Sequence, residues 1–157
     1  MFTKFLTVFL VSMLPLAELR VAVPLAVGMK LPLVASYIIC IIGNMIPVPF
    51  IYFFARKVLE WGAEKPILEK TFTWILKKGE KGGEKLMAKV GRSTYVALFL
   101  FVGIPIPGTG AWTGTLAASI LDLDFKKSVL AALGGVLLAG VIMGVASTGV
   151  FSLIGLV

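Results

Sequence analysis

The residues best able to do chemistry in this chain are an acid and a base two positions apart, Glu18 and Arg20, inside an apolar run. Burial raises the pKa of a carboxyl and a neighbouring arginine lowers it, so a buried carboxyl of this kind can bind and release a proton. A guanidinium stays charged at physiological pH and binds phosphate or carboxylate through two parallel hydrogen bonds. We therefore predict proton coupling at Glu18 and substrate binding at Arg20. A purely structural ion pair is the alternative.

A second polar interruption, further along the chain, supplies the other half of the predicted site. Backbone amides at the start of a half-helix, together with hydroxyl groups, can hold an anionic or polar group. An indole there either stacks on a substrate or anchors at a polar boundary. The residues predicted to bind substrate in this stretch are Gly108, Thr109, Gly110, Trp112 and Thr113. Tight backbone packing without any ligand is the alternative.

Prolines are expected to position both stretches by breaking their helices. Each proline removes a backbone hydrogen bond from a helix, and broken backbone at membrane depth survives only where protein buries it or it lines a wet cavity. The breaks are predicted at Pro15, Pro24, Pro105 and Pro107. Each broken segment then forms two short helices, about half a bilayer deep.

The composition indicates an integral membrane protein. Of the 157 residues, 59% are hydrophobic and 15% are charged, whereas a soluble domain carries nearer a quarter charged residues. The net charge of +7 does not indicate nucleic acid as a partner, because most basic residues fall in one connecting segment. With no histidine and a single cysteine, Cys40, we expect no metal site and no cofactor. One candidate acid without a nucleophile motif also argues against an enzyme.

The chain divides into a single membrane domain with two similar halves. Residues 1–54 form the first half, residues 55–92 a basic linker, and residues 93–157 the second half. The linker has ten basic and five acidic side chains, which places it in the cytoplasm of a multi-pass protein of the cell (inner or plasma) membrane. Apolar residues on one face of 66–78 predict a helix lying on the membrane surface. A solvated linker is the alternative.

Two membrane arrangements remain open. In one, the segments 2–28, 31–54, 94–121 and 128–157 all cross the membrane. In the other, 2–28 and 94–121 are re-entrant hairpins, and the two halves form an inverted repeat whose hairpin tips meet near the midplane. The distribution of basic residues barely separates the two, but the prolines in mid-segment favour the hairpins. The predicted fold is therefore all-α and membrane-integral, with two re-entrant hairpins, two transmembrane helices and a cytoplasmic amphipathic segment.

Small and polar residues on the spanning helices predict close helix packing. Ser36, Cys40 and Asn44 recur every four residues, and Gly140 and Gly144 have the spacing that lets another helix approach closely. We expect a homodimer or small homo-oligomer through these faces; packing within one chain is the alternative.

The motifs Pro15-Leu-Ala-Glu18-Leu-Arg20-x-x-x-Pro24-Leu-Ala and Pro105-x-Pro107-Gly-Thr-Gly-Ala-Trp112-Thr-Gly114 resemble those of the small multidrug export proteins. That family in turn resembles a reduced form of the DedA/VTT membrane proteins. The resemblance implies hairpins packed tip to tip, an embedded acid at Glu18, an embedded arginine at Arg20, and proton-linked transport or lipid translocation. The second DedA hairpin usually carries arginines, whereas Gly108 and Gly110 stand in those places here.

Three functions follow from these features. The first is a small proton-coupled transporter for a lipid-linked or amphiphilic substrate, in contact with membrane lipids. The second is a multidrug exporter of cationic amphiphiles, in which Glu18 binds the positive charge while Phe101 and Trp112 stack on the substrate. The third is a membrane scaffold that recruits partners or acidic lipids through its basic segment.

Overall fold

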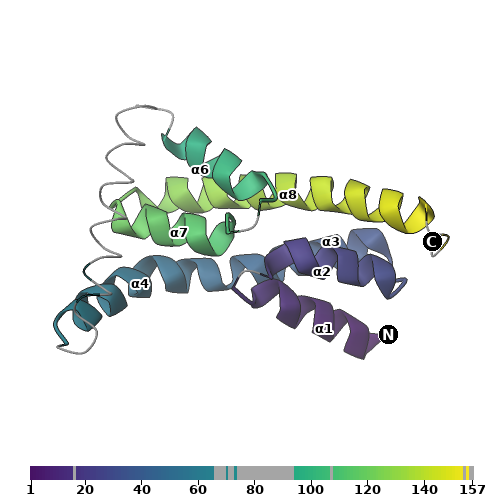
Figure 1. The fold of residues 1–157 in the computed structure, drawn as a ribbon, viewed down its shortest axis with the longest axis horizontal. Coiled ribbons are helices and arrows are strands. Elements are labelled where there is room, and N and C mark those ends of the chain that lie inside the picture. Colours follow the sequence, from purple (N-terminus) through teal and green to yellow (C-terminus); the bar gives the residue numbers. More distant parts are fainter. Residues whose placement is uncertain are drawn as a thin grey trace.

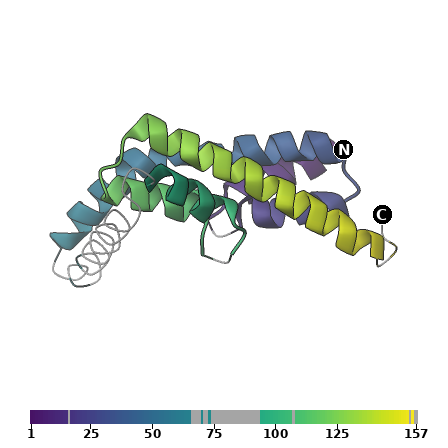
Figure 2. The same cartoon turned by 90° about the horizontal axis from the view of Figure 1, so that it is seen from above.

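The computed structural model describes residues 1–15, 17–65, 70, 73, 94–106, 108–153 and 155, and its elements there are all α-helices. In chain order they are α1 (Phe2–Met13), α2 (Glu18–Gly28), α3 (Leu33–Met45), α4 (Pro47–Ala63), α6 (Thr94–Gly103), α7 (Ala111–Ile120) and α8 (Phe125–Leu153). The predicted all-helical class is confirmed. Figures 1 and 2 show α8 running along the length of the molecule, with both chain termini at one end.

The first two helices fold back on each other to form the first hairpin. α1 ends at Met13, the chain turns through Pro15, and α2 begins at Glu18 with a positive φ of 48°. Near the start of α1, the Lys4 ammonium donates a hydrogen bond of 3.0 Å to the carbonyl of Met29, just after α2. The hairpin therefore begins and finishes at the same end of the molecule (Figure 1).

Helices α6 and α7 form a second hairpin that points the other way. The chain between them, from Ile104 to Gly110, is not helical in its described part. The backbone amide of Asp124, just after α7, donates a hydrogen bond of 3.1 Å to the hydroxyl of Tyr95 at the start of α6. The two ends of this hairpin are thus also together, and the turns of both hairpins point toward the middle of the molecule (Figure 1).

The remaining helices connect the hairpins. α3 packs against α1 and α2, α4 packs against α7, and α8 contacts helices of both hairpins. The segment predicted to cross the membrane over residues 31–54 is interrupted at Ile46, because Pro47 cannot continue the hydrogen bonding of α3 and instead starts α4. α4 then continues to Ala63, so the first residues of the predicted linker are helical.

Small and polar side chains of the long helices point inward, and apolar side chains point outward. Ser36, Cys40 and Asn44 are at most 1% exposed, whereas Ile38 and Ile42 on the same helix are each 51% exposed. Because the small and polar stripe is buried inside the chain, it is not available to a second copy, and its predicted role in a homodimer interface is wrong. Large apolar side chains on the outside of these helices and small or polar ones on their inner faces are the pattern expected of a protein surrounded by lipid.

Two stretches are long and apolar enough to cross a membrane. They are Leu33–Ala55, with a mean hydropathy of 2.1, and Phe125–Leu153, with 2.4. The hairpin helices are shorter: the twelve residues of α1 rise only about 18 Å, against a hydrocarbon core of about 30 Å. The two long apolar stretches were found within the part of the chain that the structure describes.

One predicted break is wrong and two predictions lie outside the described residues. Pro24 is inside α2, where it removes a single backbone hydrogen bond without reversing the chain. Pro107 and nearly all of the predicted surface helix 66–78 are outside the described residues.

Candidate functional site

The Glu18 carboxylate lies at the start of α7, on the opposite hairpin. The side chain is 3% exposed. Its Oε1 accepts a hydrogen bond of 2.9 Å from the amide of Trp112, and its Oε2 accepts one of 3.2 Å from the amide of Ala111. These are the first amides of α7, which have no partner within their own helix. A carboxylate at this end also interacts favourably with the helix dipole, so Glu18 caps α7 from the first hairpin.

Gly110 makes this close approach possible. It has φ 145° and ψ −175°, a conformation that is essentially restricted to glycine. A Cβ atom at this position would lie 2.2 Å from Oε2 of Glu18. The residue directly before α7 must therefore have no side chain if the carboxylate is to reach the helix.

The guanidinium of Arg20 caps the other end of the same break. Its Nη1 donates hydrogen bonds to backbone carbonyls of the residues that follow α6, and its Nη2 donates to the last turn of α6 and to a hydroxyl group. The acceptors of Nη1 are Ile106 O (2.6 Å) and Thr109 O, and those of Nη2 are Val102 O (3.2 Å), Ile104 O (3.2 Å) and Thr109 Oγ1 (2.9 Å). The last carbonyls of a helix lack intrahelical donors, and Arg20 supplies donors to them.

Trp112 completes the connection in the opposite direction. Its indole Nε1 donates a hydrogen bond of 3.2 Å to the carbonyl of Met13, the last residue of α1. Each hairpin thus sends a side chain to the helix end of the other. We call this set of contacts, made by Glu18, Arg20 and Trp112, the tip junction.

A cavity of about 260 Å³ adjoins the tip junction. Pro15 of the first turn forms one wall, Ile51 and Ala55 of α4 a second, and Trp112, Thr113 and Leu116 of α7 a third. Trp112 therefore belongs to both the cavity and the tip junction. The lining is predominantly apolar, which suits the hydrophobic part of an amphiphilic molecule.

The structure brings most of the predicted site residues together, but with other partners than predicted. The helix amides expected to hold a substrate anion bind the chain's own carboxylate, and they belong to Ala111 and Trp112, not to Gly108 and Gly110. Gly108 is exposed, and a Cβ built on it meets nothing within 4 Å. Both Nη atoms of Arg20 are also occupied by the chain itself.

The predicted helix-packing residues lie away from the tip junction. Gly140 packs within the chain, since a Cβ there would lie 2.2 Å from the Tyr37 ring. Gly144 borders a different cavity. Asn44 is buried, as close helix packing requires, but in the described part of the chain neither its Oδ1 nor its Nδ2 has a hydrogen-bond partner.

The backbone amides and carbonyls that bond Glu18 and Arg20 were not predicted from the sequence. A signal was present, because every helix end leaves unpaired amides or carbonyls, and a break inside a membrane protein leaves them without water. An acid and an arginine at one break are matched to the amides and carbonyls of another. Among the described residues, no group of three or more His, Cys, Asp or Glu side chains could hold a metal ion.

Comparison with protein families places this chain in a known group. The family model described as "Putative small multi-drug export protein" matches residues 18–142, well over half of the chain. The chain belongs to this family. The match begins at Glu18 and includes both charged residues of the tip junction and all their partners. Family and apolar helices together indicate a membrane protein.

Two further comparisons add no relative. Neither the curated proteins nor the solved structures give a match to this chain. The resemblance to the DedA/VTT proteins therefore stays a prediction.

Proposed function

We propose that this chain is a proton-coupled membrane exporter of amphiphilic small molecules, and not an enzyme, in which opening of the tip junction is the moving step. The observation that carries the proposal is the double role of Trp112. Its amide binds Glu18, its indole binds Met13, and its side chain lines the cavity next to both. A molecule that enters the cavity and displaces the indole disturbs the contacts that hold the hairpins together.

Protonation of Glu18 provides the coupling. Hydrogen bonds to a carboxylate are roughly twice as strong as those between neutral groups and contribute about 1.5–3 kcal/mol each. A protonated carboxyl loses this charge and gains an O–H donor. This donor cannot bond the amides of Ala111 and Trp112, because they are donors themselves. Proton binding therefore favours separated tips, and proton release favours joined tips.

In the proposed membrane arrangement both hairpins are re-entrant and the halves form an inverted repeat. The support is geometric: each hairpin returns to the end where it begins, its helices are too short to cross, and the hairpins cap each other reciprocally. The end that carries the basic linker is then cytoplasmic.

Cysteine labelling in a Cys40→Ser background tests this arrangement. We expect Thr3→Cys and Lys30→Cys, both exposed, to react with an impermeant maleimide from outside the cell, and the exposed Asp124→Cys to react only after permeabilisation. If α1 and α2 crossed the membrane as one segment, Thr3 and Lys30 would label from opposite sides. That result would overturn the re-entrant arrangement.

Glu18→Gln is expected to abolish proton-driven export. Glutamine cannot carry a titrating proton. Its NH2 group would also face one of the two α7 amides that bond Glu18, and both groups are donors. The measurement is efflux of ethidium, a cationic aromatic amphiphile, from proteoliposomes with an imposed pH gradient. We expect at least about a tenfold lower rate, equivalent to about 1.4 kcal/mol in the barrier.

The matched control is Glu64→Gln, an exposed acid just after α4, which should transport like the unaltered protein. Equal proton-driven efflux by Glu18→Gln and the unaltered protein would refute the role of Glu18. A fluorescent prenyl phosphate in the same assay tests a lipid-linked substrate. Preferential transport of that anion would favour the DedA-like flippase over the exporter.

The arrangement of Arg20 bears on the choice among substrates. Because its Nη atoms already serve backbone carbonyls, recognition of an anionic head group would need the tip junction to open first. Neutral or cationic amphiphiles need no such step.

The alternative function as a membrane scaffold depends on residues 66–78. If the chain is a scaffold, deleting this segment should impair its function more than Glu18→Gln does. We also propose a homodimer, with contacts outside the buried stripe of α3.

A further inference from the structure

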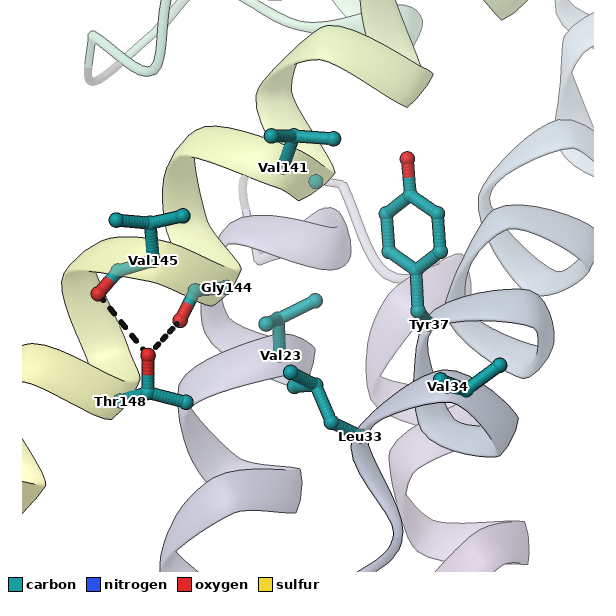
Figure 3. A pocket seen from close by; sticks show the side chains of 9 residues that line it. Val23, Leu33, Val34, Tyr37, Val141, Gly144, Val145 and Thr148 are labelled. Atoms are coloured by element: carbon teal, nitrogen blue, oxygen red, sulfur yellow. Dashed lines mark hydrogen bonds between the residues drawn. The ribbon is translucent and has the colours of Figure 1, made fainter.

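A second cavity, of about 270 Å³, lies between α2, α3 and α8, and it shares no residue with the cavity at the tip junction. Figure 3 shows its walls: Val23 of α2, Leu33 and Tyr37 of α3, and Val141 and Thr148 of α8. Its α8 wall extends from Gly140 to Thr148, a rise of about 12 Å along the helix. The cavity is therefore elongated.

The lining offers almost no polar group to a ligand. The hydroxyl of Tyr37 donates its hydrogen to the carbonyl of Leu137 at 2.7 Å. The Thr148 hydroxyl bonds the carbonyls of Gly144 and Val145 in its own helix, at 2.9 and 3.1 Å (Figure 3). An apolar cavity of about 150 Å³ stays free of water and binds benzene. This larger, longer cavity is suited to a flexible hydrocarbon chain.

Two basic residues lie at the turn between α2 and α3, which leads to the cavity residue Leu33. Lys30 is exposed and precedes the cavity residue Leu33 by three positions. The ammonium of Lys4 bonds the carbonyl of Met29 in the same turn. Two positive charges thus lie beside the turn that leads into the apolar cavity, which is the charge distribution that an anionic phospholipid complements.

We propose that this cavity binds one acyl chain of an anionic phospholipid whose phosphate lies at Lys30 and Lys4. The rim residues Val34, Val141 and Val145 are 72%, 55% and 69% exposed, so the cavity opens to the surroundings of α3 and α8, where bilayer lipid is plentiful. The bound lipid links the first hairpin, through Val23, to both spanning helices. This binding site is separate from the proposed export route and holds whether or not export is proton-coupled.

Gly144 provides a direct test, because a Cβ built on it meets nothing within 4 Å although it borders the cavity. Gly144→Leu should therefore fold and fill the cavity. Gly149, on the same helix, also has nothing within 4 Å of its Cβ and is not part of the lining, so Gly149→Leu is the matched control. Val145→Phe, with Val150→Phe as its control, fills the cavity from another position should Gly144→Leu fail to fold.

The full-length protein is reconstituted in vesicles of equal parts phosphatidylglycerol and phosphatidylcholine, with a trace of phosphatidylglycerol that carries a diazirine on one acyl chain. After illumination, mass spectrometry should locate the adduct on residues 33–37 and 140–148. We expect Gly144→Leu to lower this labelling about tenfold, which is the loss of affinity expected when roughly two methylene groups of the acyl chain are no longer buried. Gly149→Leu should leave the labelling unchanged. Replacing Lys4 and Lys30 together by glutamine should remove the preference for phosphatidylglycerol over a phosphatidylcholine probe.

Each contrary result overturns the proposal. Equal labelling of Gly144→Leu and the unaltered protein would show only lipid that surrounds the helices. Equal labelling by both lipid probes would exclude recognition of the anionic head group. Displacement of the probe by dodecyltrimethylammonium but not by unlabelled phosphatidylglycerol would assign the cavity to an exported amphiphile. A change of oligomeric state in Gly144→Leu without loss of labelling would assign it to a second copy of the chain.

Discussion

Arg20→Met is expected to lower the free energy of unfolding by about 3–5 kcal/mol and to separate the two hairpin tips. Methionine has a similar length but no donor, so the carbonyls of Val102, Ile104 and Ile106 each lose a charged donor. The Ile104 and Ile106 carbonyls keep only the weaker bonds from the Ile106 amide and from Thr109. Hydrogen bonds to charged groups contribute about 1.5–3 kcal/mol each, and Arg20 makes several of them. Unfolding in a dodecyl sulfate titration, followed by circular dichroism, measures the change.

Two variants give this experiment its controls. Arg20→Lys keeps the charge but not the planar fork that reaches several acceptors at once, so its stability should lie between those of Arg20→Met and the unaltered protein. Lys57→Met removes an exposed cation of α4 and should change the free energy of unfolding by less than about 0.5 kcal/mol. If Arg20→Met left stability unchanged and only weakened substrate binding, Arg20 would be a ligand for substrate and not a cap of α6.

The main features of the fold follow from local sequence rules. The prolines in mid-segment predict the breaks at Pro15 and Pro105, and the helices are interrupted at both. The break predicted at Pro24 is wrong because a proline deletes only one hydrogen bond, whereas a reversal of the chain also needs residues that leave the helical conformation. At the first turn this residue is Glu18, with φ 48°, and a glutamate side chain does not predict a left-handed backbone conformation.

The partners of the charged residues could not be read from the sequence. Glu18 and Arg20 are two positions apart, which suggests an ion pair, yet Arg20 is bonded to backbone 86 residues away and Glu18 to backbone 93 residues away. Side-chain patterns show which residues carry charge, but unpaired amides and carbonyls belong to every residue and become distinctive only once a helix ends. The site therefore depends on where α6 stops and α7 starts, and that boundary is the least certain part of a sequence-based prediction.

The same dependence on backbone position makes Gly110→Ala the second large effect. Alanine costs about 1–3 kcal/mol at this glycine-only conformation. Its Cβ would also meet Oε2 of Glu18 at 2.2 Å, which displaces the carboxylate from α7 and leaves the helix uncapped, a further loss of about 0.5–2 kcal/mol. We expect Gly110→Ala to be at least about 2 kcal/mol less stable than the unaltered protein and to have lost proton-driven efflux.

Gly108→Ala separates backbone strain from collision. Gly108 also has a positive φ, 85°, but nothing lies within 4 Å of its Cβ position, so its cost is strain alone, about 1–2 kcal/mol. A double-mutant cycle completes the test: in a Glu18→Ala background the carboxylate that collides is gone, and Gly110→Ala should cost at least about 1 kcal/mol less than in the unaltered protein. An identical cost in both backgrounds would mean that Glu18 does not occupy the start of α7, and the tip junction would then have no acid for a proton to act on.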